Sequence, residues 1–288
     1  MSIALALPDE KLAGLVESYG FFAMELRDQM TVGAGLVAFN ISDTQIEVDG
    51  VRRDASALFG VNTDPVFVRY SLGSDPVLTM RVAPGAYDRM LGIDMQREAG
   101  VVDVDPKRHP ILAGIDRTLR AAPKDAVSQF RALDTALLDC LPAAAPAGLA
   151  ERFWHYALAR EGDVIIAEAA DDLGCTTRSL ERACAKRLGR TPKRIARGIR
   201  VARTHWRAAE TSERPELSAD FAYADLPHYL NEMRRITGMN RREFSRSYEA
   251  ELALPYRYFW PDGREATGDE EKTSWLAERE RRWKLGST

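Results

Sequence analysis

Between Thr31 and Met90, short hydrophobic runs alternate with pairs or triplets of Asp, Asn, Ser and Gly. Short runs bounded by turn residues are typical of β-strands. Several such runs in succession favour a barrel or sandwich over alternating strands and helices. The predicted strands are Gly35–Ile41, Thr44–Val48, Pro65–Ser71 and Val77–Val82.

After Pro84-Gly85, hydrophobic residues recur at helical spacing. A short helix is predicted over Ala86–Leu91, and a longer one over Ala126–Leu141, whose apolar stripe is Phe130, Leu133, Leu137 and Leu141. The Pro- and Ala-rich segment 142–146 has the composition of a linker. The second half is predicted to be all-α, with helices over Leu149–Arg160, Val164–Leu173, Thr177–Leu188 and Lys193–Glu210, and a further helical region over Leu217–Ser247.

These patterns predict an α+β multidomain protein. We expect a β-rich domain with a helical end over residues 1–145 and a helical domain over residues 148–250. The tail 251–288 contains an aromatic block (Tyr256, Tyr258, Phe259 and Trp260) and an amphipathic segment, Asp269–Lys284. We expect this tail to pack on the C-terminal domain.

Composition places the chain among ordinary globular proteins, with 45% hydrophobic and 29% charged residues. We find neither a run long enough to span a bilayer nor a secretory signal, so we expect a cytoplasmic protein with no membrane partner. Its cysteines, Cys140, Cys175 and Cys184, are expected to be reduced thiols.

Charge is distributed unevenly along the chain. Residues 1–150 contain 14 Lys and Arg against 20 Asp and Glu, a net charge of −6. The segment Thr176–Glu210 contains eleven basic residues against two acidic ones, a net charge of +9. A basic segment in an acidic protein is typical of a polyanion-binding surface. Charge alone equally allows a solvated helix face.

The segment Val164–Leu188 has the spacing of a helix-turn-helix. In its first helix, Ile165, Ala167 and Ala170 are predicted to face inward, and Gly174 then ends the helix. Thr176 is a suitable N-cap for the second helix, whose predicted buried stripe is Leu180, Cys184 and Leu188.

The opposite face of the second helix would then carry Arg178, Glu181, Arg182 and Ala185, with Lys186 at its flank. These positions are suited to the major groove, where Arg pairs with guanine and Glu accepts from cytosine.

A second, similar unit follows, and at this point the chain resembles the AraC/XylS family of bacterial transcriptional regulators. The resemblance covers about residues 155–248. It is carried by Ala170, Gly174, Thr176, Arg178, Leu180, Arg182, the Gly189–Pro192 turn, Arg200–Arg203, His228-Tyr229, Met233 and Thr237-Gly238-Met239. It implies two helix-turn-helix subdomains joined by a long helix, and double-stranded DNA of a promoter or operator as the partner.

The resemblance implies base contacts by Arg178, Glu181 and Arg182 in the first unit and by Leu226, Pro227 and Asn231 in the second. The full set of expected DNA-binding residues is Thr176, Thr177, Arg178, Glu181, Arg182, Lys186, Arg190, Lys193, Pro227, His228, Asn231 and Arg235.

The second unit departs from the family pattern at Ala222-Tyr223, Pro227 and Asn231, and Pro215 interrupts the preceding helix. Leu226 and Pro227 cannot form bidentate hydrogen bonds with bases. We therefore expect this unit mainly to hold phosphates, through Arg234, Arg235, Arg241 and Arg242.

The N-terminal half resembles the cupin-like sensor domain of some members, through the segment Arg81–Gly92 with its Pro-Gly turn and Leu-Gly helix end. Because this half is acidic, we expect a small-molecule effector or a second copy of the chain, as a homodimer, rather than DNA as its partner.

Enzymatic chemistry finds little support in the sequence. A single histidine, His109, accompanies Asp103 and Asp105, so we expect a turn there and no metal or other cofactor. We find no phosphate-binding loop or nucleophile elbow. We therefore expect a transcription regulator and no enzyme. The alternatives are a non-catalytic interaction or sensing module with weakened DNA binding, and an enzyme in the β-rich half.

Overall fold

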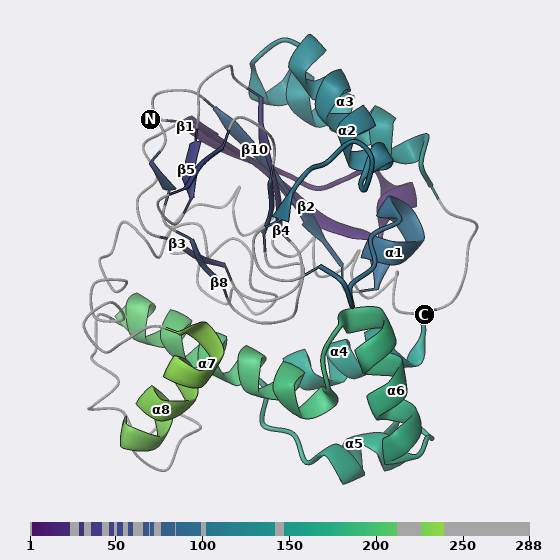
Figure 1. Cartoon of the computed structure of the whole chain (residues 1–288), viewed down its shortest axis with the longest axis vertical. Coiled ribbons are helices and arrows are strands. Elements are labelled where there is room, and N and C mark those ends of the chain that lie inside the picture. The colour runs from purple at the N-terminus through teal and green to yellow at the C-terminus, as the bar shows by residue number, and fades with distance from the viewer. Residues whose placement is uncertain are drawn as a thin grey trace.

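A computed structural model describes residues 2–23, 29–31, 36–41, 46–48, 51–53, 57–59, 66–68, 70–71, 76–83, 85–98, 102–141, 147–211 and 226–238. The predicted linker and the tail lie outside the described residues. Within them, the N-terminal half combines strands with helices, and the C-terminal half is helical (Figure 1). No helix in these ranges is both long and apolar enough to cross a membrane.

The strands are β1 (Ser2–Ala6), β2 (Val16–Ala23), β3 (Gln29–Thr31), β4 (Leu36–Asn40), β5 (Ile46–Val48), β6 (Val51–Arg53), β7 (Ala57–Phe59), β8 (Val66–Val68), β9 (Tyr70–Ser71), β10 (Val77–Val82) and β11 (Val102–Asp103). Six of them form an antiparallel sheet in the order β1-β2-β10-β4-β7-β11. The pair β3-β8 and the trio β6-β5-β9 form smaller sheets.

The helices are η1 (Glu10–Leu12, 3-10), α1 (Ala86–Leu91), α2 (Pro110–Ala121), α3 (Ala126–Leu138), α4 (Leu149–Ala159), α5 (Ile166–Asp172), α6 (Thr177–Leu188), α7 (Pro192–Thr211) and α8 (Leu226–Thr237). The predictions for β10, α1 and α6 match these bounds. The predicted strand over 65–71 is two short strands in different sheets, and the predicted helix over 126–141 ends at Leu138, which leaves Leu141 exposed.

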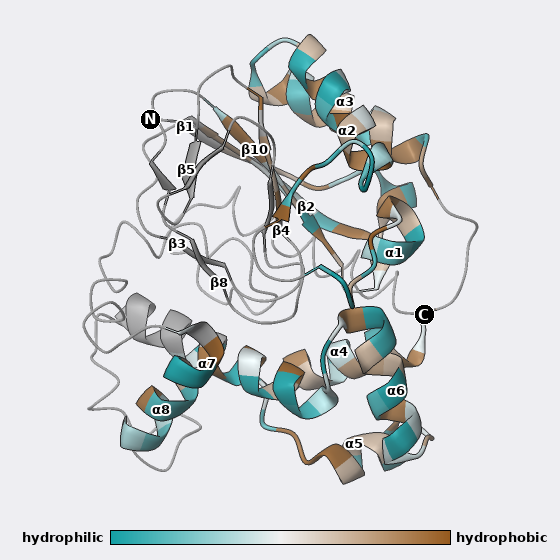
Figure 2. Cartoon of the chain, in the orientation of Figure 1, coloured by the Kyte–Doolittle hydropathy of each residue, from teal (hydrophilic) through white to brown (hydrophobic). Residues whose placement is uncertain are grey.

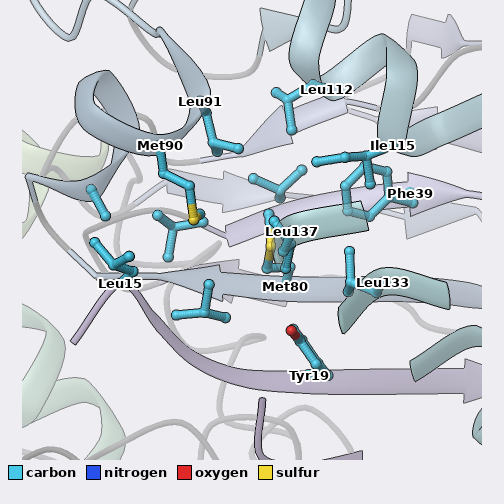
Figure 3. Packing of buried hydrophobic residues seen from close by; sticks show 14 of the residues in the cluster. Leu15, Tyr19, Phe39, Met80, Met90, Leu91, Leu112, Ile115, Leu133 and Leu137 are labelled. Carbon is cyan, nitrogen blue, oxygen red and sulfur yellow. The ribbon is translucent and has the colours of Figure 1, made fainter. Parts of the chain in front are cut away.

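The N-terminal core is formed by the alternate side chains of each strand that point to one face of the sheet. Tyr19, Met80 and Phe39, on neighbouring strands, project to one face of the sheet, where helices α2 and α3 cover them (Figure 3). Figure 2 shows hydrophobic and hydrophilic residues alternating around these helices, as expected where only one side packs on a sheet.

A second hydrophobic core lies in the C-terminal half and is separate from the first. It is formed by α4, α5, α6 and the start of α7, around Phe153, Trp154 and Leu180. Helix α4 packs against both α6 and α7. This core fixes the position of α6.

Candidate functional site: two helices with exposed basic faces

The turn between α5 and α6 is a compact helix C-cap. Gly174 has a φ of +67°, and its N–H donates to the carbonyl of Asp171 at 3.0 Å. The N–H of Cys175 donates to the carbonyl of Ala170 at 2.9 Å. This pair of bonds is a Schellman motif, in which the left-handed residue is usually glycine. The prediction that Gly174 ends the helix is therefore confirmed.

The prediction for the inward face of α5 is partly wrong. Ala169 and Ala170 are buried, whereas Ala167 is exposed and Ile165 is 63% exposed. Ile165 is the N-cap and has an extended backbone, with φ −88° and ψ 115°. Because α5 begins at Ile166, Ile165 lies outside the helix and does not share its buried face.

Helix α6 begins and packs as the sequence predicts. The Thr176 hydroxyl accepts a hydrogen bond from the N–H of Ser179 at 3.1 Å, which satisfies one of the free donors of the first turn. Leu180, Cys184 and Leu188 are fully buried. Burial raises the pKa of the Cys184 thiol to about 12, so this cysteine is a packing residue and not a nucleophile.

The predicted DNA-contacting residues of the first unit lie mostly at the surface. Arg190 is half-buried, and its guanidinium donates to the carbonyl of Gly189 at 3.0 Å. The remaining residues are exposed: Thr176, Thr177, Arg178, Glu181, Arg182, Lys186 and Lys193.

Eight of the eleven basic residues of Thr176–Glu210 fall into two groups in the structure. Four arginines form ion pairs within the protein: Arg187 with Asp88, Arg197 and Arg200 with Glu232, and Arg203 with Glu161. By contrast, Arg178, Arg182, Lys186 and Lys193 are exposed and form no ion pair with any residue that the structure describes. The surface available to a polyanion is therefore smaller than the eleven charges of the sequence indicate.

Helix α8 presents the predicted residues of the second unit on one face. Pro227, His228, Asn231, Arg234 and Arg235 are exposed or partly exposed there. On the other side, Tyr229, Met233 and Ile236 are buried. Arg241, Arg242 and the departures at Ala222-Tyr223 and Pro215 lie outside the described residues.

Glu232 links α8 to α7, and the sequence analysis did not identify it. It is 3% exposed, and its carboxylate accepts from Arg200 at 2.9 Å and from Arg197. A buried carboxylate with two guanidinium partners holds two helices in a fixed relation. The signal was present in the sequence as an acidic residue on the otherwise apolar stripe of α8.

Buried charged and histidine side chains form two clusters in the described part of the N-terminal half. Glu17 and Arg81 form an ion pair at 2.6 Å, with both side chains less than a tenth exposed. In the predicted turn near Asp103, the N–H of Asp105 donates to Nδ1 of His109 at 3.1 Å, and Nε2 of His109 lies 3.3 Å from Glu98. Both ring nitrogens of His109 are thus engaged within the protein.

Solved structures similar to this chain include several of ToxT from Vibrio cholerae. One ToxT structure has a TM-score of 0.43 at 9% identity, covering 85% of this chain and 98% of ToxT. A single-residue variant of ToxT in its apo form has a TM-score of 0.42 at 9% identity, covering 78% and 96%. Wild-type ToxT with bound unsaturated fatty acid has a TM-score of 0.39 at 9% identity, covering 83% and 93%.

Neither a protein-family model nor a curated protein sequence matches the chain.

Proposed function

We propose that the chain is a sequence-specific DNA-binding transcription regulator of the AraC/XylS type, not an enzyme. The observation that carries this proposal is the exposed face of α6, on which Arg178, Glu181 and Arg182 stand out from a helix fixed by a glycine turn, an N-cap and an apolar stripe. In this proposal α5 and α6 are a helix-turn-helix, and α6 enters the major groove.

The proposal divides the chain into a sensor or dimerisation domain over 1–145 and a DNA-binding domain over 148–250. The two separate hydrophobic cores support this division. Arg178 and Arg182 would read base edges, and Lys186 and Lys193 would contact phosphates. Helix α8 would be the second recognition helix, and its Arg234 and Arg235 would contact the phosphates of the DNA backbone.

For the N-terminal domain we propose a small-molecule effector. The sheet face that α2 and α3 leave uncovered carries the ion pair of Glu17 and Arg81 together with Ser18 and Thr79, all buried. Charged and polar side chains collected on one face of a sheet are suited to orient a polar ligand. We infer a cupin-like domain, with this face on its inside.

The test is a titration of the full chain against its own upstream DNA at several salt concentrations. Each phosphate contact lowers the slope of log K against log salt by about 0.9. The four cations proposed to contact phosphates, Lys186, Lys193, Arg234 and Arg235, therefore predict a slope of about −4, against about −10 if all eleven basic residues of Thr176–Glu210 did so. A competitor of scrambled sequence measures specificity. A flat salt dependence, or equal binding to both sequences, contradicts the proposal.

A further inference from the structure

One carboxylate lies within the exposed basic face of α6. Glu181 is the only acidic residue of this helix, whose other charged residues are Arg178, Arg182, Lys186 and Arg187. Its side chain is exposed, and it forms no ion pair with any residue that the structure describes. The carboxylate is therefore available to a group outside the chain.

The stability of α6 does not explain a glutamate at this position. Glu stabilises an exposed helix when a basic residue follows four positions later, but position 185 is Ala. Arg178 precedes Glu181 by three positions, which is the less favourable order for such a pair. Glu181 is also the fifth residue of α6, beyond the first turn, so it gains little from the helix dipole. Glu181 is thus better suited to recognition than to helix stability.

Arg178, Glu181 and Arg182 lie on one side of α6 at a spacing that matches neighbouring base pairs. Successive residues of an α-helix are rotated by about 100°, so these three lie within an arc of about 100°. Each residue advances the helix by about 1.5 Å, which separates Arg178 and Arg182 by about 6 Å along its axis. Base pairs in DNA are about 3.4 Å apart. A helix lying in the groove would therefore place the three side chains over about two or three successive base pairs.

The chemistry of these side chains favours G·C pairs. Guanine presents two acceptors, O6 and N7, to the major groove, and they match the guanidinium fork of Arg178 or Arg182. Cytosine presents its 4-amino group, a donor that matches the carboxylate of Glu181. Thymine presents an acceptor there, and adenine combines its amino group with the acceptor N7 beside it. A carboxylate therefore selects cytosine among the four bases.

Glu181 also opposes binding to unrelated DNA. Its carboxylate repels the phosphates of any sequence, and a donor on a base compensates for bringing this charge into the groove. The cations around it have no such preference, because every sequence carries the same phosphate backbone. A carboxylate among cations thus weakens binding to every sequence that does not place cytosine before it.

We propose that Glu181 is a specificity-determining residue of α6, which accepts a hydrogen bond from the 4-amino group of a cytosine in a core of about two or three successive G·C pairs. Arg178 and Arg182 contact guanines of the same core, and Glu181 disfavours other sequences by repulsion. The proposal rests on the proposed function and names the DNA that α6 recognises under it.

The first test selects the duplexes that bind the full chain from a pool of random sequence. The wild type is compared with Glu181→Gln, which has nearly the same shape but no charge. The matched control is Glu168→Gln on α5. Glu168 is exposed and forms no ion pair within the described part of the chain. The control thus removes an equal charge from the same half of the protein.

We expect the wild type to enrich a sequence with a core of G·C pairs. Glu181→Gln should change the preference at one pair of this core from C·G to A·T, because a glutamine amide forms two hydrogen bonds with adenine. Its binding to unrelated DNA should become several-fold tighter, because the repulsion is removed. Glu168→Gln should leave the preferred sequence unchanged.

A change to one group of the DNA then tests the contact itself. Replacement of the selected cytosine by 2-pyrimidinone removes its 4-amino group alone. We expect this replacement to weaken binding of the wild type about tenfold and binding of Glu181→Ala less than about twofold. Comparing the two proteins on the same pair of duplexes cancels any effect of the replacement on the duplex itself.

An unchanged preferred sequence for Glu181→Gln, or equal losses for the wild type and Glu181→Ala on the 2-pyrimidinone duplex, overturns the role of Glu181. A wild type that enriches a sequence without a G·C core overturns the DNA named here and leaves the proposed function standing. If the wild type enriches no sequence, the proposed function itself fails and the role of Glu181 fails with it.

Discussion

Helices α6 and α8 have the same length and the same proposed role, but they are held in place by different means. Apolar residues hold α6: Leu180, Cys184 and Leu188 are fully buried. The buried side of α8 also contains a carboxylate, Glu232, which pairs with two arginines of α7. Apolar packing tolerates small adjustments, whereas a buried ion pair loses most of its stabilisation when one partner is removed.

The outer faces differ as well. Helix α6 exposes three cations and Glu181, side chains that form several hydrogen bonds with base edges or phosphates. Helix α8 exposes Pro227 and Asn231 in the equivalent region, with its arginines nearer the C-terminal end. Under the proposed function, this contrast suits α6 to reading bases and α8 to holding a fixed position. Each prediction below tests one side of this contrast.

The largest effect is expected from Glu232→Ala. It leaves Arg197 and Arg200 without their carboxylate, and breaking a buried pair in this way costs about 3 kcal/mol. Because both arginines are 20–28% exposed, we expect the lower end of the usual range. Chemical denaturation measures the loss, and hydrogen exchange should localise it to α8 and α7. A loss spread equally over α6 would contradict the separate anchoring of the two helices.

Acid should weaken the core beneath α6. Burial lowers the pKa of His155, on α4, to about 4. The His155 imidazole therefore binds a proton less readily in the folded state than in the unfolded chain, where the pKa of histidine is near 6.5. The contribution of neutral His155 to the free energy of unfolding is complete above pH 6.5. It declines by about 3 kcal/mol in total as the pH falls to 4. Denaturation midpoints at several pH values measure it. His155→Phe should remove this part of the pH dependence, and an unchanged profile in that variant would assign it to other groups.

Base reading should be unequal between the two helices. A good bidentate contact discriminates between bases by about 1–3 kcal/mol. Arg178→Ala or Arg182→Ala should therefore cost about 2 kcal/mol and relax specificity at a defined base pair. Asn231→Ala should cost clearly less and affect all sequences similarly. A base-substitution scan of the upstream DNA measures both. Equal losses of specificity from Arg178→Ala and Asn231→Ala would contradict the asymmetry.

Features of the fold could be predicted from the sequence where the interacting residues are close together along the chain. The turn at Gly174, the cap at Thr176 and the stripe of α6 were predicted because each is a local pattern within a few residues. The long strand β2 and helix α2 were missed. Strand β2 is defined by its pairing with β1 and β10, and β10 is distant in sequence. Helix α2, by contrast, has a local pattern that the prediction did not use, with Leu112, Ile115 and Leu119 at helical spacing after Pro110.

The difference between local and long-range interactions also explains which features of the candidate site could be predicted. Exposure of Arg178 and Arg182 follows from helical periodicity, so it could be predicted. The neutralisation of Arg187 by Asp88 and of Arg197 by Glu232 could not, because the partners are 99 and 35 residues apart. Counting charges along the chain therefore overestimates the basic surface that α6 and α7 offer to a polyanion.

The smallest effect concerns the start of α6. Thr176→Ala removes the hydrogen bond from the N–H of Ser179, and loss of an N-cap costs about 1 kcal/mol. Thr176→Ser keeps the capping oxygen and is the matched control. Because Thr176 is also an expected DNA contact, the two roles are separated by measuring stability without DNA and affinity with it. If only the cap matters, Thr176→Ser restores both quantities. A stable Thr176→Ser variant with weakened binding would show that the methyl group contacts DNA, which would extend the reading surface of α6 to its N-cap.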